Sequence, residues 1–281
     1  MILVTGANGM VGSYVKEIFN DQIPVLTDIP EMDVTDPERV FSLFARHRPA
    51  MVLHLAAETN VDRCEKDHDH AFKTNALGTH NVALACQKYD AVMIYISTDM
   101  VFNGRKGKVH TEYDDPTFAN VYGKSKYEGE RAVKELLNRY YIFRAGWMIG
   151  GGPEKDKKFV GKIIEISKLR SEIQAVNDKY GSLTYARHLV AGIKKIVKTG
   201  YYGLYHLVNT GEISRYDIAI EMMRILKRKV TVVPVSSDKF PLPAPRAESG
   251  AMRNMKLDFL GINPMPGWKE ALEEYLGEWE K

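Results

Sequence analysis

Ile2-Leu3-Val4-Thr5-Gly6-Ala7-Asn8-Gly9-Met10-Val11-Gly12 opens the chain, an apolar run followed by glycines in the spacing G-x-x-G-x-x-G. The apolar run predicts a buried strand, and we expect a helix after the glycines. Gly6 and Gly9 permit a tight turn and a close approach of backbone to a pyrophosphate, while Gly12 lets the helix pack closely. The start of a helix also offers free amides to an anion. We therefore predict a dinucleotide-binding turn rather than a merely structural one, formed by Gly6, Asn8, Gly9, Met10, Val11 and Gly12.

A carboxylate ends the second predicted strand. Asp28 follows Gly6 by 22 residues, the separation at which an acidic side chain accepts hydrogen bonds from the adenosine ribose of a dinucleotide. The alternative is that Asp28 caps or solvates a turn beside Pro30. A carboxylate here would repel a 2′-phosphate, so NADH is favoured, and NADPH stays open because the end of this strand is irregular.

Short apolar runs alternate with helical patterns through the first half of the chain. The predicted strands cover residues 2–4, 23–26, 51–55, 92–96 and 141–143, and the predicted helices cover residues 10–19, 37–47, 71–88 and 122–139. Continuously apolar short strands are typical of a parallel sheet covered on both faces. Thr35 or Asp36 as N-cap, with Pro37 at the first helical position, marks the start of the second helix. The fold class is therefore α/β, a doubly wound parallel sheet of the Rossmann-like kind.

The pattern loosens after about residue 147. Helices are predicted over residues 159–170, 187–198, 214–227 and 268–279, with a strand at 204–208 and a Pro-rich stretch at 234–245. We expect residues 1–147 to form the dinucleotide-binding domain, to which segments at about 184–210 return. Residues 148–281 would mainly form a smaller substrate-binding portion. Lys155, Lys157 and Lys158 are expected in a solvated loop that a phosphate-bearing ligand could use.

The composition narrows the class of protein. The 281 residues are 44% apolar and 27% charged, and the net charge of +3 comes without a run of five basic residues, so we expect no nucleic-acid partner. Cys64 and Cys86 are the two cysteines, and neither lies in a C-x-x-C pair, so we expect buried thiols, no bound metal and a reducing compartment. Because the N-terminus shows no basic-then-apolar leader and no apolar run could span a membrane, a cytoplasmic protein without membrane contact is expected.

Tyr122 and Lys126 stand four residues apart in a predicted helix, which puts both side chains on one face, one turn apart. An ammonium held near a phenol favours the phenolate and would lower the pKa of the Tyr122 hydroxyl. Such a phenol can pass a proton to or from a carbonyl or hydroxyl oxygen. Taken alone, the pair also fits an ordinary surface helix. The glycine turn favours the catalytic interpretation.

Several further motifs accompany the turn and the Tyr-Lys pair, at residues 33–36, 54–62, 75–79, 96–104, 121–130, 144–147, 180–185 and 203–206. Together these segments resemble the extended short-chain dehydrogenase/reductase superfamily over nearly the whole chain. Within it, the chain is similar to the dTDP-4-dehydrorhamnose reductases, chiefly through Ser97-Thr98-Asp99-Met100-Val101-Phe102-Asn103-Gly104.

The resemblance implies a catalytic trio of Thr98, Tyr122 and Lys126. Thr98 would hold the substrate carbonyl, Tyr122 would donate the proton, and Lys126 would bind the nicotinamide ribose and stabilise the phenolate. Thr98 ends the fourth predicted strand, where parallel sheets of this type place ligand-contacting residues. The alternative for Thr98 is a cap on the following loop.

The resemblance also implies further contacts with the cofactor. Asp33 and Val34 would lie along the adenine, and Thr59 would sit towards the nicotinamide. A cofactor channel would be lined by the backbones of Leu55, Ala56 and Ala57. A strand that simply runs into a loop explains these three apolar residues equally well.

On the substrate side, the resemblance implies contacts from Val61, Thr98, Met100, Trp147 and Arg246. The Trp147 indole could cover the sugar ring or be an ordinary core side chain, and Arg246 could pair with the substrate diphosphate. We expect His206 in the core and Asn75 as a brace for a loop.

The chain departs from the usual reductase pattern at several positions. Met100 stands where these reductases usually carry Tyr, Ala145-Gly146 replaces Thr-Ser, and Leu183 and Ala247 each replace Pro. None of these changes touches the trio or the glycine turn, so they leave the substrate open but not the cofactor chemistry.

The expected activity is therefore NADPH- or NADH-dependent reduction of a 4-keto-6-deoxy sugar nucleotide, in the first place dTDP-4-dehydro-L-rhamnose, in dTDP-rhamnose biosynthesis. A homodimer is one candidate for the assembly. One alternative is a sugar-nucleotide epimerase or dehydratase of the same superfamily. A dehydratase places an Asp-Glu pair after the Thr, and here Asp99 is followed by Met100. Another alternative is a non-catalytic regulatory subunit that binds a dinucleotide, like the β subunit of methionine adenosyltransferase.

Overall fold

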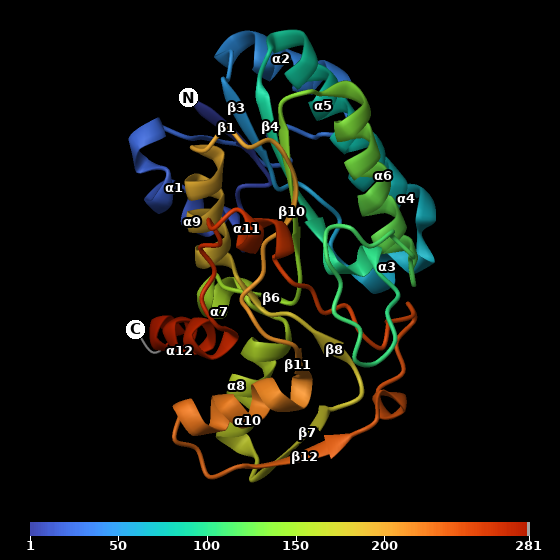
Figure 1. The fold of residues 1–281 in the computed structure, drawn as a ribbon, viewed down its shortest axis with the longest axis vertical. Coiled ribbons are helices and arrows are strands. Elements are labelled where there is room, and N and C mark those ends of the chain that lie inside the picture. Colours follow the sequence, from blue (N-terminus) through green and yellow to red (C-terminus); the bar gives the residue numbers. More distant parts are fainter. Residues whose placement is uncertain (280–281) are drawn as a thin grey trace.

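Six parallel strands in the order β10-β5-β4-β3-β1-β2 form the central sheet (Figure 1). The structure is a computed structural model and describes residues 1–279. The strands are β1 (Ile2–Thr5), β2 (Val25–Leu26), β3 (Met51–His54), β4 (Val92–Thr98), β5 (Tyr140–Ala145) and β10 (Gly203–His206).

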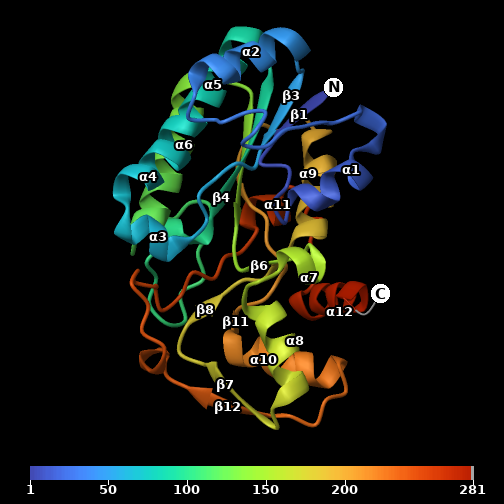
Figure 2. The ribbon, with the colours of Figure 1, turned by 180° about the vertical axis from the view of Figure 1, so that it is seen from behind.

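Helices cover both faces of this sheet (Figures 1 and 2). One face carries α2 (Pro37–His47), α5 (Gly78–Tyr89) and α6 (Val121–Leu136), and the other carries α1 (Val15–Ile18) and α9 (Ala186–Val197). Successive strand residues point to opposite faces. Leu3 thus packs in one apolar cluster with Phe44 of α2, and Val4 packs in the other with Ile193 of α9. The predicted doubly wound parallel sheet is confirmed.

The strand order reverses beside β1. The chain passes from β1 to β2 on one side and then crosses over to β3 on the other side. Ligands of open α/β sheets bind beyond the carboxyl ends of the strands at such a switch point. Here the glycine turn after Thr5 and the segment after His54 meet at that edge, because Leu55 and Ala56 donate their amides to the Thr5 hydroxyl at 3.2 Å.

Two predicted elements near the N-terminus were too long. The predicted helix 10–19 is a 3-10 turn at Gly12–Tyr14 followed by the four residues of α1. The predicted strand 23–26 begins only at Val25, because Pro24 has no amide to donate and Ile23 lies in the left-handed region at φ 50°. By contrast, α2 has the predicted bounds, and Asp36 is its N-cap, accepting from the amides of Glu38 and Arg39.

The predicted helix 71–88 is interrupted. It consists of α4 (His68–Phe72), a π-helical turn at Lys73–Leu77 and α5. The π turn carries the buried Asn75, whose Nδ2 donates to the Ser125 hydroxyl of α6 at 3.0 Å and to the Glu58 carbonyl at 3.1 Å. The expected bracing role of Asn75 is confirmed.

Past β5 the chain builds a second, smaller layer below the sheet (Figure 2). Its strands pair as β6 (Met148–Ile149) with β9 (Thr184–Tyr185), β7 (Glu172–Val176) with β12 (Thr231–Val235), and β8 (Tyr180–Gly181) with β11 (Ile213–Ser214). Its helices are α7 (Gly152–Lys155), α8 (Phe159–Leu169), α10 (Arg215–Ile225) and α12 (Trp268–Trp279). The short helices α3 (Val61–Lys66) and α11 (Met255–Phe259) lie beside the main sheet.

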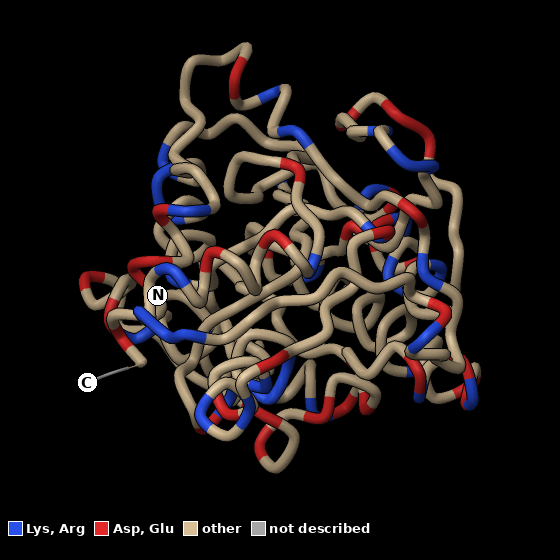
Figure 3. Tube along the Cα trace, turned by 90° about the horizontal axis from the view of Figure 1, so that it is seen from below, with Lys and Arg blue, Asp and Glu red and all other residues tan. Residues whose placement is uncertain are grey.

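Basic and acidic segments are interspersed along the trace in the view from below (Figure 3). Within residues 1–279, no helix is both long and apolar enough to cross a membrane. Cys64 and Cys86 are buried free thiols, as predicted, and burial raises the pKa of each.

Candidate functional site

A cavity of about 1020 Å³ lies beyond the carboxyl ends of β1, β3 and β4. Every residue that the sequence nominated for cofactor, substrate or catalysis lines it: Gly6, Asn8, Gly9, Met10, Val11, Gly12, Asp28, Asp33, Val34, Leu55, Ala56, Ala57, Thr59, Val61, Thr98, Met100, Tyr122, Lys126, Trp147 and Arg246. Cavities of this size accommodate cofactors and drug-sized ligands. The structure thus brings the nominated residues together, whereas their individual roles stay predictions.

The three glycines of the turn meet different surroundings. Gly6 has φ +64°, and a Cβ there would lie 2.6 Å from the Ala56 amide nitrogen, so the turn needs glycine to pack on the segment after β3. A Cβ on Gly12 would overlap the Ala7 carbonyl, so the fold itself also requires glycine there. At Gly9 a Cβ would meet only the Gly6 carbonyl oxygen, at 3.3 Å. The Gly9 backbone therefore faces open space that a ligand could approach.

Two carboxylates stand at one end of the cavity. Asp28 Oδ2 accepts from the Asn8 amide at 2.8 Å, which ties the end of β2 to the glycine turn. Asp33 Oδ1 accepts from the amide and the hydroxyl of Thr35, both at 2.9 Å, and the amide contact is the main cause that lowers the pKa of Asp33. Two carboxylates thus stand at this end of the cavity, where Lys73 and Arg39 also act on Asp33 and lower its pKa further.

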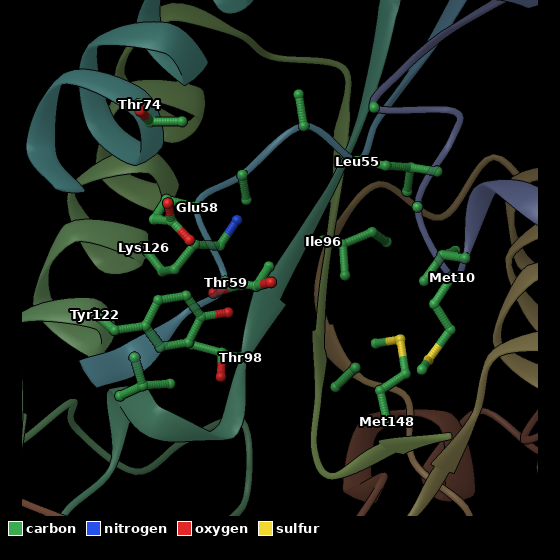
Figure 4. Close-up of a pocket in the computed structure, with 18 of the residues that line it drawn as sticks. Met10, Leu55, Glu58, Thr59, Thr74, Ile96, Thr98, Tyr122, Lys126 and Met148 are labelled. Carbon is green, nitrogen blue, oxygen red and sulfur yellow. The ribbon is translucent and has the colours of Figure 1, made fainter. Parts of the chain in front are cut away.

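Thr98 and Tyr122 face each other on one wall of the cavity, with Lys126 and Glu58 next to them (Figure 4). Thr98 is the last residue of β4, and Tyr122 lies in the first turn of α6, whose N-cap Asn120 accepts from the Gly123 amide at 2.9 Å. A Cβ on Gly123 would overlap the Met100 carbonyl. The glycine after Tyr122 thus lets α6 approach the turn after Thr98 closely enough to bring the two hydroxyls together.

Burial dominates the titration of the Tyr-Lys pair. It raises the pKa of the Tyr122 phenol, and the neighbouring Asp99 carboxylate acts in the same direction, while the Thr98 hydroxyl opposes both. Burial also lowers the pKa of the Lys126 ammonium to about 7, against the attraction of Glu130. The Lys126 Nζ lies 4.2 Å from the centre of the Tyr95 ring. The expectation of a lowered phenol pKa is wrong: the net effect of these surroundings raises the pKa of Tyr122, so the phenol keeps its proton at neutral pH.

The Thr98 hydroxyl is already engaged. It donates to Asp99 Oδ1 at 3.0 Å and accepts from the Met100 amide at 3.1 Å. Burial raises the pKa of the Asp99 carboxyl to about 6, with the Thr98 hydrogen bond opposing it. Thr98 therefore caps the following loop, the alternative considered for it, and at the same time presents its oxygen to the cavity.

Arg246 is also engaged. Its guanidinium pairs with Asp62 at 3.0 Å and donates to the Ala244 carbonyl at 2.6 Å. This pairing ties the Pro-rich segment to α3 across the cavity. A substrate diphosphate that bound to Arg246, as the resemblance implies, would therefore compete with Asp62 for the guanidinium.

Sequence reasoning missed several charged residues that line the cavity. They are Glu58, Arg63, Lys73, Asp99 and Arg215, together with the titratable His70. Glu58 Oε2 contacts Arg63 Nη1 at 3.0 Å and His70 Nε2 at 3.1 Å, so these three side chains are linked to one another at the cavity. Lys158 was expected in a solvated loop, and the structure places it on the cavity wall. Arg215 stacks on Trp147, with its guanidinium carbon 3.8 Å from the ring centre.

His206 is fully buried, as predicted for a core histidine, with Nδ1 3.1 Å from the Arg253 carbonyl oxygen. Across residues 1–279, no group of three or more His, Cys, Asp and Glu side chains is arranged to hold a metal ion.

Comparison with protein families and curated proteins gives a consistent picture. Residues 1–280 match the model of the RmlD substrate binding domain. The chain is 34% identical to the dTDP-4-dehydrorhamnose reductase of Streptomyces griseus, covering 97% of this chain and 91% of that protein. It is 31% identical to the spore coat polysaccharide biosynthesis protein SpsK of Bacillus subtilis, covering 99% and 97%.

Comparison with solved structures also finds dTDP-4-dehydrorhamnose reductases among the similar proteins. The dTDP-4-dehydrorhamnose reductase of Bacillus anthracis, solved in complex with NADP, has a TM-score of 0.94 and 37% identity, covering 99% of this chain and 98% of that chain. The dTDP-4-dehydrorhamnose reductase of Clostridium acetobutylicum gives a TM-score of 0.95 at 35% identity, covering 100% of this chain and 99% of that chain. The UDP-glucose 4-epimerase of Thermus thermophilus, at 20% identity and a TM-score of 0.82 with 99% and 98% covered, shares the fold.

Proposed function

Because this chain belongs to the RmlD substrate binding domain family, we propose that it is an NAD(P)H-dependent reductase of a 4-keto-6-deoxy sugar nucleotide. The first candidate substrate is dTDP-4-dehydro-L-rhamnose, on which relatives with 31–34% identity act by name. One observation carries the proposal: the Tyr122 and Thr98 hydroxyls line the same cavity as the glycine turn.

The residues present fit a nicotinamide dinucleotide. Gly9 leaves its backbone open where a side chain would otherwise stand, which suits a pyrophosphate, and the amides of Met10 and Val11 follow it. Asp28 and Asp33 would take the ribose and adenine end, Leu55 to Ala57 the middle, and Lys126 the nicotinamide ribose. When bound, the cofactor would supply the hydride that the keto carbon accepts.

Tyr122 is the proton donor in this proposal. Reduction of a ketone leaves an alkoxide that needs one proton, and a buried phenol with a raised pKa holds that proton until charge develops. Lys126, one turn further along α6, would stabilise the phenolate that remains. A substrate carbonyl would compete with Asp99 for the proton of the Thr98 hydroxyl.

Two carboxylates beside the cofactor's adenosine support NADH over NADPH, because within residues 1–279 no basic side chain forms an ion pair with Asp28 or Asp33. The Bacillus anthracis relative was solved with NADP, so the selectivity of this chain is a matter for direct measurement, taken up below.

We also propose that different parts of the chain bind the cofactor and the substrate. The segment before residue 147 would bind the dinucleotide, while the layer formed after it would bind the substrate and contributes Trp147, Arg215 and Arg246 to the cavity. This division is supported by β10, which pairs with β5 in the main sheet, and by α9, whose Ile193 packs in the same apolar cluster as Val4 of β1. Free buried cysteines support a cytoplasmic location.

Oxidation of NADH and NADPH by the purified chain, measured across a panel of 4-keto sugar nucleotides, tests the activity. We expect turnover with dTDP-4-dehydrorhamnose and a product heavier by two hydrogen atoms. An epimerase would instead interconvert sugars without consuming added NAD(P)H. A regulatory subunit would bind the dinucleotide and turn over none of the panel, and that result would overturn the proposal.

A further inference from the structure

The main cavity continues into a second cavity of about 470 Å³. This second cavity lies between the layer formed after β5 and the Pro-rich segment, and its lining includes Tyr180, Phe240 and Pro241. The residues shared by both linings are Asp99, Met100, Trp147, Arg215, Leu242 and Arg246. A ligand that reaches from Tyr122 into the second cavity must therefore pass these residues, which we call the junction.

Arg215 is held at the junction by aromatic faces. It follows the N-cap Ser214 at the start of α10, and its guanidinium carbon lies 3.8 Å from the Trp147 ring centre and 5.0 Å from that of Phe159. Stacking of this kind uses the flat face of the guanidinium and leaves the N–H donors at its edge free. Among residues 1–279, no hydrogen bond or ion pair is formed by the Arg215 side chain.

The second guanidinium of the junction, that of Arg246, already forms hydrogen bonds within the protein. It donates to the Asp62 carboxylate and to the Ala244 carbonyl. The acids nearest Arg215 are also committed elsewhere, because Asp99 accepts from Thr98, and Asp156 accepts from the Tyr275 hydroxyl and the Lys158 amide. Arg215 is thus the junction cation without a committed anionic partner.

The charge of Arg215 is retained in these surroundings. Burial lowers the pKa of the guanidinium to about 10, while Asp99 and Asp156 oppose the shift, so the group is cationic at neutral pH. Lys158 adds a second positive charge on the same cavity wall. Asp99 and Asp156 attract the guanidinium, but within residues 1–279 neither carboxylate forms an ion pair with it. A half-buried cation without a directly paired anion is less favourable than one that an anion contacts.

We propose that Arg215 binds the diphosphate of the sugar nucleotide, placing the sugar under Trp147 at Tyr122 and the nucleoside in the second cavity. This inference rests on the proposed function. A planar guanidinium can donate hydrogen bonds to two phosphate oxygens at once, and stacking on Trp147 fixes the orientation of the Arg215 guanidinium. Arg215 would therefore make this enzyme select nucleoside diphosphate sugars over sugar monophosphates.

Calorimetric binding of dTDP and dTMP to the full chain tests this role, with NADPH binding measured alongside. Arg215→Met keeps the aliphatic part of the side chain beside Trp147 and removes the guanidinium with its paired N–H donors. Arg215→Lys keeps the positive charge but not the guanidinium. Arg224→Met, on an exposed arginine of the same helix that pairs with Glu221 at 2.7 Å, is the matched control.

For Arg215→Met we expect the Kd of dTDP to rise at least about tenfold, that of dTMP to rise less, and that of NADPH to stay within about twofold. Arg215→Lys should fall between this variant and the wild type, because a lysine contributes a point charge without the paired N–H donors. Arg224→Met should match the wild type for all three ligands.

Three results would overturn the assignment: unchanged dTDP affinity in Arg215→Met, equal losses for dTDP and NADPH in both Arg215 variants, or no binding of dTDP by the wild type. Failure of the proposed reduction looks different. In that case dTDP binding would still depend on Arg215, while no 4-keto sugar nucleotide would be reduced.

Discussion

The Glu130 carboxylate receives the Arg144 guanidinium in two hydrogen bonds, Oε1 from Nε at 2.8 Å and Oε2 from Nη2 at 2.7 Å. Both side chains are buried, with exposed fractions of 0% and 3%. The Ser97 hydroxyl donates to the same carboxylate at 2.6 Å. Because Glu130 lies one turn beyond Lys126, this pair fixes α6, which carries Tyr122 and Lys126, to β4 and β5.

Glu130→Gln should destabilise the fold strongly. The change leaves the Arg144 charge buried without its partner, which costs about 3–5 kcal/mol of unfolding free energy. Chemical denaturation measures the loss. Glu128→Gln, two residues earlier and in a more exposed pair with Arg131 at 3.0 Å, is the control and should change stability by less than about 1 kcal/mol. Equal effects of the two variants would contradict the structural role of the Glu130–Arg144 pair.

Substitutions of Gly9 and Gly12 should have different effects, one on cofactor binding and the other on folding. A Cβ at position 12 overlaps the Ala7 carbonyl, so Gly12→Ala should lower the melting temperature markedly. A Cβ at position 9 meets only the Gly6 carbonyl at 3.3 Å, so Gly9→Ala should fold nearly normally and yet bind NADH and NADPH at least about tenfold more weakly. Tight cofactor binding by folded Gly9→Ala protein would remove the turn from the cofactor site.

Asp99 should make the stability depend on pH. Its pKa in the folded chain is about 6, raised from 3.8 by burial, so the folded state binds more protons between these values. By linkage, the stability that this group contributes is complete below about pH 4 and is lost as the pH rises through about 6. The stability of Asp99→Asn relative to wild type should therefore increase between pH 4 and 6 and stay level above. A parallel offset between Asp99→Asn and the wild type at all pH values would contradict the raised pKa of Asp99.

The carboxylate at the end of β2 should set cofactor preference. Asp28→Asn removes the negative charge that opposes a 2′-phosphate but keeps an oxygen that can accept from the Asn8 amide. We expect the ratio of kcat/KM for NADPH to that for NADH to rise about tenfold, which corresponds to about 1.4 kcal/mol. An unchanged ratio, with intact turnover, would show that Asp28 only braces the turn.

Local signals predicted much of this fold. Asp36 and Pro37 mark the start of α2 within the sequence itself, and continuous apolar runs identified the parallel strands. The predictions were wrong where local geometry overrode the pattern, as at Ile23 with its left-handed φ and at the π turn of Lys73–Leu77. These features depend on how the segments pack, which periodicity does not encode.

In the candidate site too, the sequence predicted which residues meet but not the features that depend on tertiary packing. Spacing and resemblance nominated Thr98, Tyr122 and Lys126, and the fold brings all three to one cavity. Neither signal revealed that burial governs the pKa of Tyr122, because tertiary packing determines burial. The partners of Arg215 and Arg246 were equally hidden, since they come from segments far apart in the chain.

Steady-state turnover of Tyr122→Phe with saturating NAD(P)H and dTDP-4-dehydrorhamnose tests the central claim most directly. Loss of the proton donor should reduce kcat about 10²- to 10⁴-fold, while the Kd of NADPH stays near that of the wild type because the phenyl ring still fills its place. Near-wild-type turnover by Tyr122→Phe would contradict proton donation by Tyr122.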